Sequence, residues 1–314
     1  MRESRRTALK SLVAGTVTLA AAGIIPACAE QQQKNDEQLQ PTEPEGLKNA
    51  INHSVCRWTY NEMSLEELCK TVKDIGFSAI DLVGPGEWEV LRKWGITSSM
   101  CNGAEINLED GWNNKSNHAT LIKNYTDMIP RVAQAGYKNL ICFSGNRRGM
   151  SEEEGLNNSA EGLNQIMPLA KEHGVIIHME LLNSKVNHPD YMADHSAWGV
   201  ELCKRLGTDN FKLLYDIYHM QVMEGDIIST IQKNHQYFGH YHTAGVPGRH
   251  EIDNSQELYY PAIMHAILAT GFKGYVAQEF TPAKEDKVAS LREAIRICDV
   301  TAADAAPAAA AKQG

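Results

Sequence analysis

The chain has 314 residues, of which 43% are hydrophobic and 22% charged, so it can bury a large core and is not a disordered polymer. Its net charge is −9, and the first 28 residues contribute +3 from four basic and one acidic side chain, which leaves −12 for the rest. Nucleic-acid binding requires clustered lysine and arginine. The acidic body therefore argues against nucleic acid as a partner and favours a small molecule.

The first 28 residues have the features of an export signal. Arg5 and Arg6 precede an apolar run, residues 12–27, which is too short for a membrane span and has the size of a signal-peptide core. This arrangement resembles a twin-arginine signal, which exports folded proteins, and a Sec signal with two arginines is the alternative. The run ends in Pro26-Ala27-Cys28, which is similar to a bacterial lipobox. We therefore expect a periplasmic protein that is anchored to the membrane by a lipid on Cys28.

Three further segments follow from composition. Residues 29–48 are polar and poor in apolar side chains, which predicts a flexible linker. Residues 49–300 form the catalytic domain, and residues 301–314 form an alanine-rich tail that we expect to fray.

Six cysteines follow Cys28, and their spacing contains no CxxC pair, so neither a zinc ribbon nor a redox motif is present. A chain that folds before export first meets a reducing cytosol, which predicts buried free thiols rather than disulfides. These cysteines are Cys56, Cys69, Cys101, Cys142, Cys203 and Cys298.

The domain repeats one pattern, in which an amphipathic stretch is followed by a glycine and then by a short strand-like run. Glycine just past a helix end adopts the left-handed conformation that closes the last turn. A seventh unit carries Asn234 at this point, and Ser64 and Ser151 begin capping boxes that predict helix starts. The six glycines are Gly76, Gly95, Gly136, Gly174, Gly207 and Gly271.

Eight strands are predicted in alternation with helices, which indicates a parallel sheet. Eight βα units in one domain predict an α/β protein with the (β/α)₈ TIM barrel fold. An open doubly wound sheet is the alternative, but no GxGxxG follows the first strand. The predicted strands are residues 52–56, 79–83, 97–101, 139–143, 175–180, 212–216, 237–242 and 275–279.

Four consecutive strands, the fifth to the eighth, end in a carboxylate or an imidazole. In a βα barrel the chemistry gathers at this end of the strands. Three neighbouring carboxylates repel one another unless a cation lies among them, and a mixed oxygen and nitrogen set suits Mn²⁺, Mg²⁺ or Co²⁺ better than Zn²⁺. A salt-bridged polar residue explains one such strand end but not four. The predicted ligands of one divalent metal ion are Glu180, Asp216, His242 and Glu279.

Further polar groups in the loops that follow these strands are candidates for contact with the substrate, because a cation or imidazole there can orient a substrate oxygen. These candidates are His219, Arg249, Lys185 and His240. The alternatives are a loop salt bridge for Arg249, a solvated side chain for Lys185 and a packed core histidine for His240. Trp58 and Trp112 follow the first and third strands, where each can line the pocket or pack in the core.

Two segments, YDIYHMQ at 215–221 and PGRHE at 247–251, carry a resemblance to a known family, with support from GFSAIDL at 76–82 and ELLNSK at 180–185. The chain resembles the hydroxypyruvate isomerase branch of the xylose isomerase-like barrels, loosely across residues 50–298. This superfamily also contains ketose 3-epimerases, inosose dehydratases and endonuclease IV.

The resemblance implies that the four predicted ligands hold a metal ion, that Glu180 and Glu279 transfer protons, and that His219 and Arg249 contact the substrate. One position departs from the pattern, because hydroxypyruvate isomerases tend to carry glutamine where His242 stands. The pair His240 and His242 is closer to that of the ketose 3-epimerases. The change preserves metal binding but weakens the assignment of hydroxypyruvate as the substrate.

These observations predict a metal-dependent isomerase that interconverts a hydroxy-ketone and a hydroxy-aldehyde, or two epimers, through a cis-enediolate with Glu180 and Glu279 as acid and base. A ketose 3-epimerase or a dehydratase of keto-sugars or inososes would use the same site. A non-catalytic sugar-binding lipoprotein is the alternative from another class, whereas a nuclease would need three zinc ions and a basic surface. The sequence leaves open which sugar or hydroxy-keto acid is bound and whether the chain forms a homo-oligomer.

Overall fold

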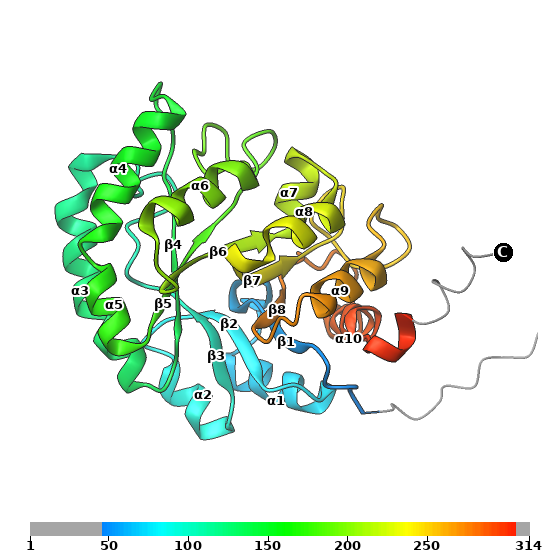
Figure 1. The fold of residues 1–314 in the computed structure, drawn as a ribbon. Coiled ribbons are helices and arrows are strands. Elements are labelled where there is room, and N and C mark those ends of the chain that lie inside the picture. The colour runs from blue at the N-terminus through cyan, green and yellow to red at the C-terminus, as the bar shows by residue number, and fades with distance from the viewer. Residues whose placement is uncertain (1–45, 306–314) are drawn as a thin grey trace, which may run out of the picture. The chain divides into compact units, whose positions relative to one another are not determined.

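The computed structural model describes residues 46–305, in which eight parallel strands form one sheet in the order β1-β8-β7-β6-β5-β4-β3-β2 (Figure 1). A parallel bridge between Cys56 and Asp81 joins the two edge strands and closes the barrel. The (β/α)₈ fold is confirmed, and every predicted strand end lies within one residue of the observed one. The strands are β1 (Asn52–Val55), β2 (Ala79–Val83), β3 (Thr97–Cys101), β4 (Asn139–Cys142), β5 (Ile176–Glu180), β6 (Phe211–Asp216), β7 (Phe238–Thr243) and β8 (Tyr275–Gln278).

Helices surround the strands and bury their apolar faces against the outside of the barrel (Figure 1). They are α1 (Leu65–Ile75), α2 (Trp88–Trp94), α3 (His118–Gln134), α4 (Glu152–Asn164), α5 (Met167–His173), α6 (Ser196–Leu206), α7 (Ile217–Met223), α8 (Ile227–Asn234), α9 (Tyr260–Ala269) and α10 (Lys287–Cys298). Short 3₁₀ helices lie at Arg57–Tyr60, Lys115–Asn117, His235–Tyr237 and Ala302–Ala305. A separate apolar cluster of Met100, Ile141 and Leu214, on β3, β4 and β6, fits the packed interior of such a barrel.

The predicted start and stop signals act as expected at most helices. All six glycines have positive φ angles, and Ser64 forms a reciprocal capping box at the start of α1. Ser151 makes only half of a box, since its hydroxyl accepts the Glu154 N–H and no return bond forms. The prediction for Asn234 was wrong: its φ is −121°, because the chain continues into the 3₁₀ helix His235–Tyr237 instead of reversing.

All six described cysteines are buried and free, as predicted. The first residues of the tail form the 3₁₀ helix Ala302–Ala305, in which the Asp304 carboxylate lies 3.0 Å from the Lys48 ammonium group, and residues 306–314 lie outside the described residues. Among residues 46–305, no helix has the length and apolar character needed to cross a membrane. The export signal, the lipid on Cys28 and the linker up to residue 45 lie outside the described residues and stay predictions.

Candidate metal centre

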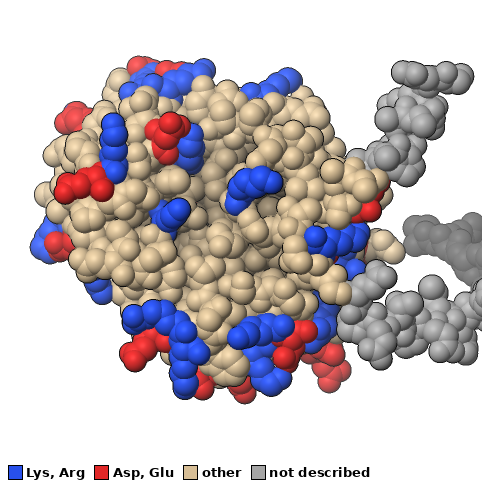
Figure 2. All heavy atoms as spheres, turned by 60° about the horizontal axis from the view of Figure 1, so that its bottom comes forward, with Lys and Arg blue, Asp and Glu red and all other residues tan. Residues whose placement is uncertain are grey.

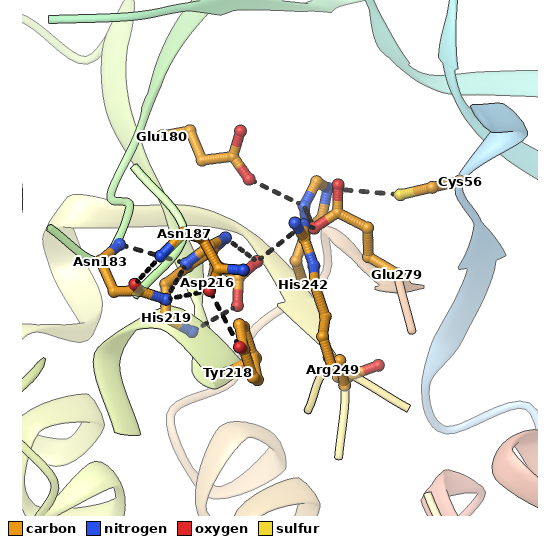
Figure 3. A network of polar contacts seen from close by, with 12 residues as sticks. Cys56, Glu180, Asn183, Asn187, Asp216, Tyr218, His219, His242, Arg249 and Glu279 are labelled. Carbon is orange, nitrogen blue, oxygen red and sulfur yellow. Dashed lines mark hydrogen bonds and ion pairs between the residues drawn. The ribbon is translucent and has the colours of Figure 1, made fainter. Parts of the chain in front are cut away.

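The four predicted metal ligands converge at one end of the barrel (Figure 3). Glu180 ends β5, Asp216 ends β6, His242 lies near the end of β7, and Glu279 directly follows β8. One donor atom from each residue lies within 4.8 Å of the other three, and no side chain in the group is more than 5% exposed. The carboxyl ends of neighbouring parallel strands meet at one rim, which is why residues distant in sequence assemble here.

The two carboxylate oxygens of Asp216 have different partners, one in the helix that follows and the other in the cluster. Its Oδ1 accepts the backbone N–H of His219 at 3.0 Å and so caps the N-terminus of α7. Its Oδ2 lies 3.7 Å from the His219 Nε2 and 3.9 Å from a guanidinium nitrogen of Arg249. One oxygen therefore fixes the turn from strand to helix, and the other faces the cluster, where it can bind an ion.

His242 lies at the centre of the group. Its Nδ1 is 3.1 Å from Glu180 Oε1 and 3.0 Å from Glu279 Oε2. Glu279 is held further by the Trp58 indole N–H, which donates to Oε1 at 2.9 Å, and by Arg249, which donates to Oε2 at 2.5 Å. The two glutamates thus approach the same imidazole nitrogen from different strands.

The charges of the cluster favour a bound cation. Burial and the Glu279 carboxylate raise the pKa values of Glu180 and Asp216. Burial also opposes ionisation of Glu279, but Arg249 and His242 outweigh it and hold the pKa of Glu279 well below its usual range. A divalent ion among these oxygens would stabilise all three carboxylates in their charged form. The buried His, Glu and Asp cluster is therefore consistent with a divalent metal site.

The PGRHE segment explains how Arg249 reaches the cluster. Arg249 has a left-handed φ of 62°, and its carbonyl accepts the Thr281 N–H at 2.7 Å. Glu251 anchors the same loop, since its carboxylate accepts two backbone N–H groups of the loop after β8 at 2.8 and 2.9 Å. The guanidinium carbon lies 5.1 Å from the Trp58 ring centroid and 5.7 Å from that of Tyr218, within range of cation–π attraction. The structure thus places Arg249 against the predicted metal ligands, and its contact with a substrate stays a prediction.

His219 also lies at the cluster, and its protonation follows from its partners. Its Nδ1 accepts the backbone N–H of Asn183 at 3.1 Å, so that nitrogen carries a lone pair. Burial and Arg249 lower the pKa of His219 well below its usual range, which leaves the ring neutral with its proton on Nε2. Nε2 has no hydrogen-bond partner among the described residues. His219 therefore presents an unused N–H donor beside Asp216.

The structure places two of the four predicted substrate-binding residues elsewhere. The Lys185 ammonium group donates to the carbonyls of the last two residues of α7, at 2.7 and 3.1 Å, and so caps the end of that helix. His240 is completely buried, with its Nε2 2.9 Å from an Asp81 oxygen, as a core histidine would be. Of the two tryptophans that were candidates for lining the pocket, Trp58 reaches the cluster, whereas Trp112 is completely buried in the core.

Sequence reasoning missed two residues that contact His242. Asp81 Oδ1 lies 2.9 Å from the His242 Nε2, on the opposite side of the ring from the glutamates. The Cys56 sulfur lies 3.9 Å from the same nitrogen and 3.6 Å from Asp81 Oδ1. The one available signal was a lone carboxylate within the apolar strand AIDLV, where an unpaired charge would be costly.

Barrel and cluster together define a (β/α)₈ protein with a buried metal-type site at the carboxyl end of its strands. The family model "Xylose isomerase-like TIM barrel" matches residues 69–299. The chain belongs to this family.

Curated relatives carry isomerase names. The chain is 34% identical over 113 residues to 2-oxo-tetronate isomerase of Cupriavidus necator, which covers 36% of this chain and 43% of that protein. It is 25% identical over 246 residues to a putative hydroxypyruvate isomerase of Drosophila melanogaster, covering 75% and 92%. The match to the Cupriavidus necator protein thus spans less than two thirds of the length of that protein.

Solved structures share the fold. A family 2 AP endonuclease from Brucella melitensis superimposes with a TM-score of 0.68 and 24% identity, over 77% of this chain and 97% of that one. A 3-keto-D-glucoside 4-epimerase from E. coli superimposes with a TM-score of 0.66 and 18% identity, over 79% and 100%. At these identities the likeness establishes the architecture alone.

Proposed function

We propose that the protein is a metal-dependent sugar isomerase or epimerase, which moves a proton between adjacent carbons, or between the two faces of one carbon, in a hydroxy-carbonyl substrate. The convergence of Glu180, Asp216, His242 and Glu279 carries the proposal. The isomerase names of the curated relatives agree with it. The oxygen-rich donor set favours Mn²⁺, Mg²⁺ or Co²⁺ over Zn²⁺.

A divalent ion held by these four residues would supply Lewis acidity to a substrate carbonyl and its neighbouring hydroxyl. Glu180 and Glu279 are the acid–base pair: one removes the proton from the carbon that this polarisation acidifies, and the other returns it. Arg249 lowers the pKa of Glu279 through their ion pair. His219 donates its Nε2–H to a substrate oxygen, because its Nδ1 is already committed to Asn183.

A small polyhydroxylated substrate suits the site better than a nucleic acid. Figure 2 shows a face on which basic and acidic side chains mix around the edge while its centre is mostly uncharged, with no continuous basic patch. The ammonium group of Lys185 is used in capping α7, which leaves Arg249 as the cation in contact with the ligand set. A neutral sugar therefore fits at least as well as a keto acid.

The direct test is metal analysis of the purified protein, followed by an NMR screen of ketoses and hydroxy-keto acids in D₂O. The proposal expects one divalent ion per chain and deuterium incorporation without loss of water. The product distinguishes the two forms, since an isomerase shifts the carbonyl and an epimerase inverts one carbon. Water loss would instead identify a dehydratase, and tight binding without exchange a sugar-binding protein; either result contradicts the proposal.

Replacing either acid–base residue tests the assignment of roles. Glu180→Gln and Glu279→Gln preserve shape and one oxygen, and each should slow deuterium exchange by about 10²–10⁴-fold, the usual contribution of general acid–base catalysis. Glu89→Gln, at an exposed position on α2, is the matched control and should leave the rate unchanged. Circular dichroism checks that each variant is folded. Exchange within threefold of wild type in either site variant would exclude that residue as a proton carrier.

A further inference from the structure

Asp81 lies beside the four-residue cluster, and no role is predicted for it from the sequence. It is completely buried in β2, where an uncompensated carboxylate would be strongly disfavoured. Four side chains from β3, β7 and the end of β1 surround its two oxygens. Oδ1 faces the His242 Nε2 at 2.9 Å and the Cys56 sulfur at 3.6 Å, and Oδ2 faces the His240 Nε2 at 2.9 Å and the Ser99 hydroxyl at 2.5 Å.

The backbone of β2 is irregular at this point, and the irregularity aims Asp81 inward. The register between β2 and β3 shifts on both sides of Asp81, and the following residue, Leu82, has a left-handed φ of 56°. The same stretch makes the bridge to Cys56 that closes the barrel. Bulges of this kind redirect single side chains and occur beside active sites. A strained backbone that places one carboxylate against an imidazole favours a specific role for that contact.

The contact determines which nitrogen of His242 can bind an ion. A neutral imidazole has one protonated nitrogen and one with a lone pair. Carboxylates face both nitrogens of His242: Asp81 faces Nε2, and Glu180 and Glu279 face Nδ1. An ion held by the two glutamates would take the place of the proton on Nδ1, and Asp81 would keep the other proton on Nε2. A carboxylate behind a ligating histidine fixes both the orientation of the ring and its tautomer, and raises the basicity of the other nitrogen.

We infer that Asp81 is a positioning residue for the proposed metal centre: it holds the proton of His242 on Nε2 and thereby presents the Nδ1 lone pair to the ion. Asp81 itself binds no metal and touches no substrate. The inference rests on the proposed function only in requiring that the four-residue cluster binds a divalent ion.

A second reading is that Asp81, His240 and His242 themselves hold another ion, since their donor atoms also lie within 4.8 Å of one another. Asp81 lies 2.9 Å from a nitrogen of each histidine, and its contact with His242 has the length and geometry of a charge-assisted hydrogen bond. The geometry therefore favours direct contact over an intervening ion.

The test is the affinity of the metal-free protein for Mn²⁺, measured by competition with a chromophoric chelator, with no turnover involved. Asp81→Asn, which loses the charge, should weaken binding about 10-fold, and Asp81→Ala, which loses the contact, up to about 100-fold. Asp81→Glu should restore part of the loss, because the carboxylate returns. Ser99→Ala is the matched control: it removes a hydrogen bond from Asp81 without touching His242, and should change the affinity less than threefold.

A spectroscopic readout separates positioning from a general loss of structure. In Zn²⁺-loaded protein with ¹⁵N-labelled histidine, the wild type should show His242 with a protonated Nε2, and Asp81→Ala should lose that slowly exchanging proton. Thermal unfolding of the metal-free variants checks that they fold. Wild-type Mn²⁺ affinity in folded Asp81→Ala would overturn the inference, as would loss of a second Mn²⁺ equivalent, which would make Asp81 a ligand. No Mn²⁺ binding by the wild type would overturn the proposed function as well.

Discussion

At the scale of single residues, Trp58 has an unusual position, because its indole touches both Glu279 and the neighbouring cation, Arg249. The N–H donates to Glu279 Oε1, while the ring face lies against the Arg249 guanidinium. The side chain is 38% exposed, so it forms part of the rim above the buried cluster. A donor on Glu279 favours the charged form of that carboxylate and restricts its rotation.

Trp58→Phe keeps an aromatic face for Arg249 and removes the donor. A hydrogen bond to a charged group contributes about 1.5–3 kcal/mol, and partial exposure reduces this to about 1 kcal/mol, so proton transfer should slow about fivefold. The rate of deuterium exchange into the substrate measures the effect. The control is Trp94→Phe, whose indole nitrogen has no partner among the described residues, and it should leave the rate unchanged. Equal rates for the two variants would show that the Trp58 hydrogen bond has no part in proton transfer.

The sequence could predict that the four residues of the cluster meet because each stands at the end of a strand, and barrel topology brings strand ends together whatever their sequence spacing. Asp81 lies in mid-strand, and its role depends on a local shift in register that strand periodicity does not encode. The position of the Lys185 side chain could not be predicted for a related reason. Its loop was identified correctly, but the direction of the side chain depends on where α7 ends relative to that loop, which is a tertiary feature.

At the scale of elements, β7 is closely constrained by the strands beside it. It delivers His242 to the cluster and His240 to Asp81, and it begins beside Gly239, where the register with β6 shifts. A Cβ atom at Gly239 would lie 2.5 Å from the His178 ring and 2.9 Å from the Lys212 Cβ. The neighbouring strands therefore allow no side chain there, and the position of β7 depends on a glycine.

Gly239→Ala should force β7 away from its neighbours and take His242 with it. Overpacking of this kind costs about 1–3 kcal/mol, and we expect a loss of that size in the free energy of unfolding in urea, together with weaker Mn²⁺ binding. Gly86→Ala is the matched control, because its added Cβ meets no atom within 4 Å. If both variants unfold at the same urea concentration, the contact at Gly239 is not the constraint that the structure indicates.

Helix ends were the most predictable elements, and the exception shows why. Glycine marks the helix end correctly at six positions because it adopts the left-handed conformation without steric cost. A glycine that follows an amphipathic stretch therefore predicts the end of the helix. Asn234 is only permissive of that conformation, and the following residues continue as a 3₁₀ helix instead. Ser64 and Ser151 differ in the same way, since the first forms a full capping box with its glutamate and the second does not.

At the scale of the whole molecule, an ion bound at the cluster would be coupled to the stability of the fold. Burial and neighbouring carboxylates raise the folded-state pKa of Asp216 above its unfolded value. Such a group opposes folding once the pH exceeds its unfolded pKa, so Asp216 should reduce the stability of the metal-free protein as the pH rises through the acidic range towards neutrality. A divalent ion reverses this effect, because it binds the ionised carboxylates of the folded state and has no assembled site in the unfolded chain.

Mn²⁺ should therefore raise the melting temperature of the metal-free protein at neutral pH. At a free concentration of 100 times Kd the stabilisation is about 2.7 kcal/mol, and at about 2–4 °C per kcal/mol for a domain near this size the rise is about 5–10 °C. Asp216→Asn retains a side chain that can cap α7 and removes the buried charge. Metal-free Asp216→Asn should thus melt at or above the wild-type temperature, yet gain much less from Mn²⁺. Scanning calorimetry of both proteins, with EDTA and with Mn²⁺, measures the four temperatures. An equal gain in the two proteins would place the stabilising ion away from Asp216, and no gain in the wild type would remove the cluster as a metal site.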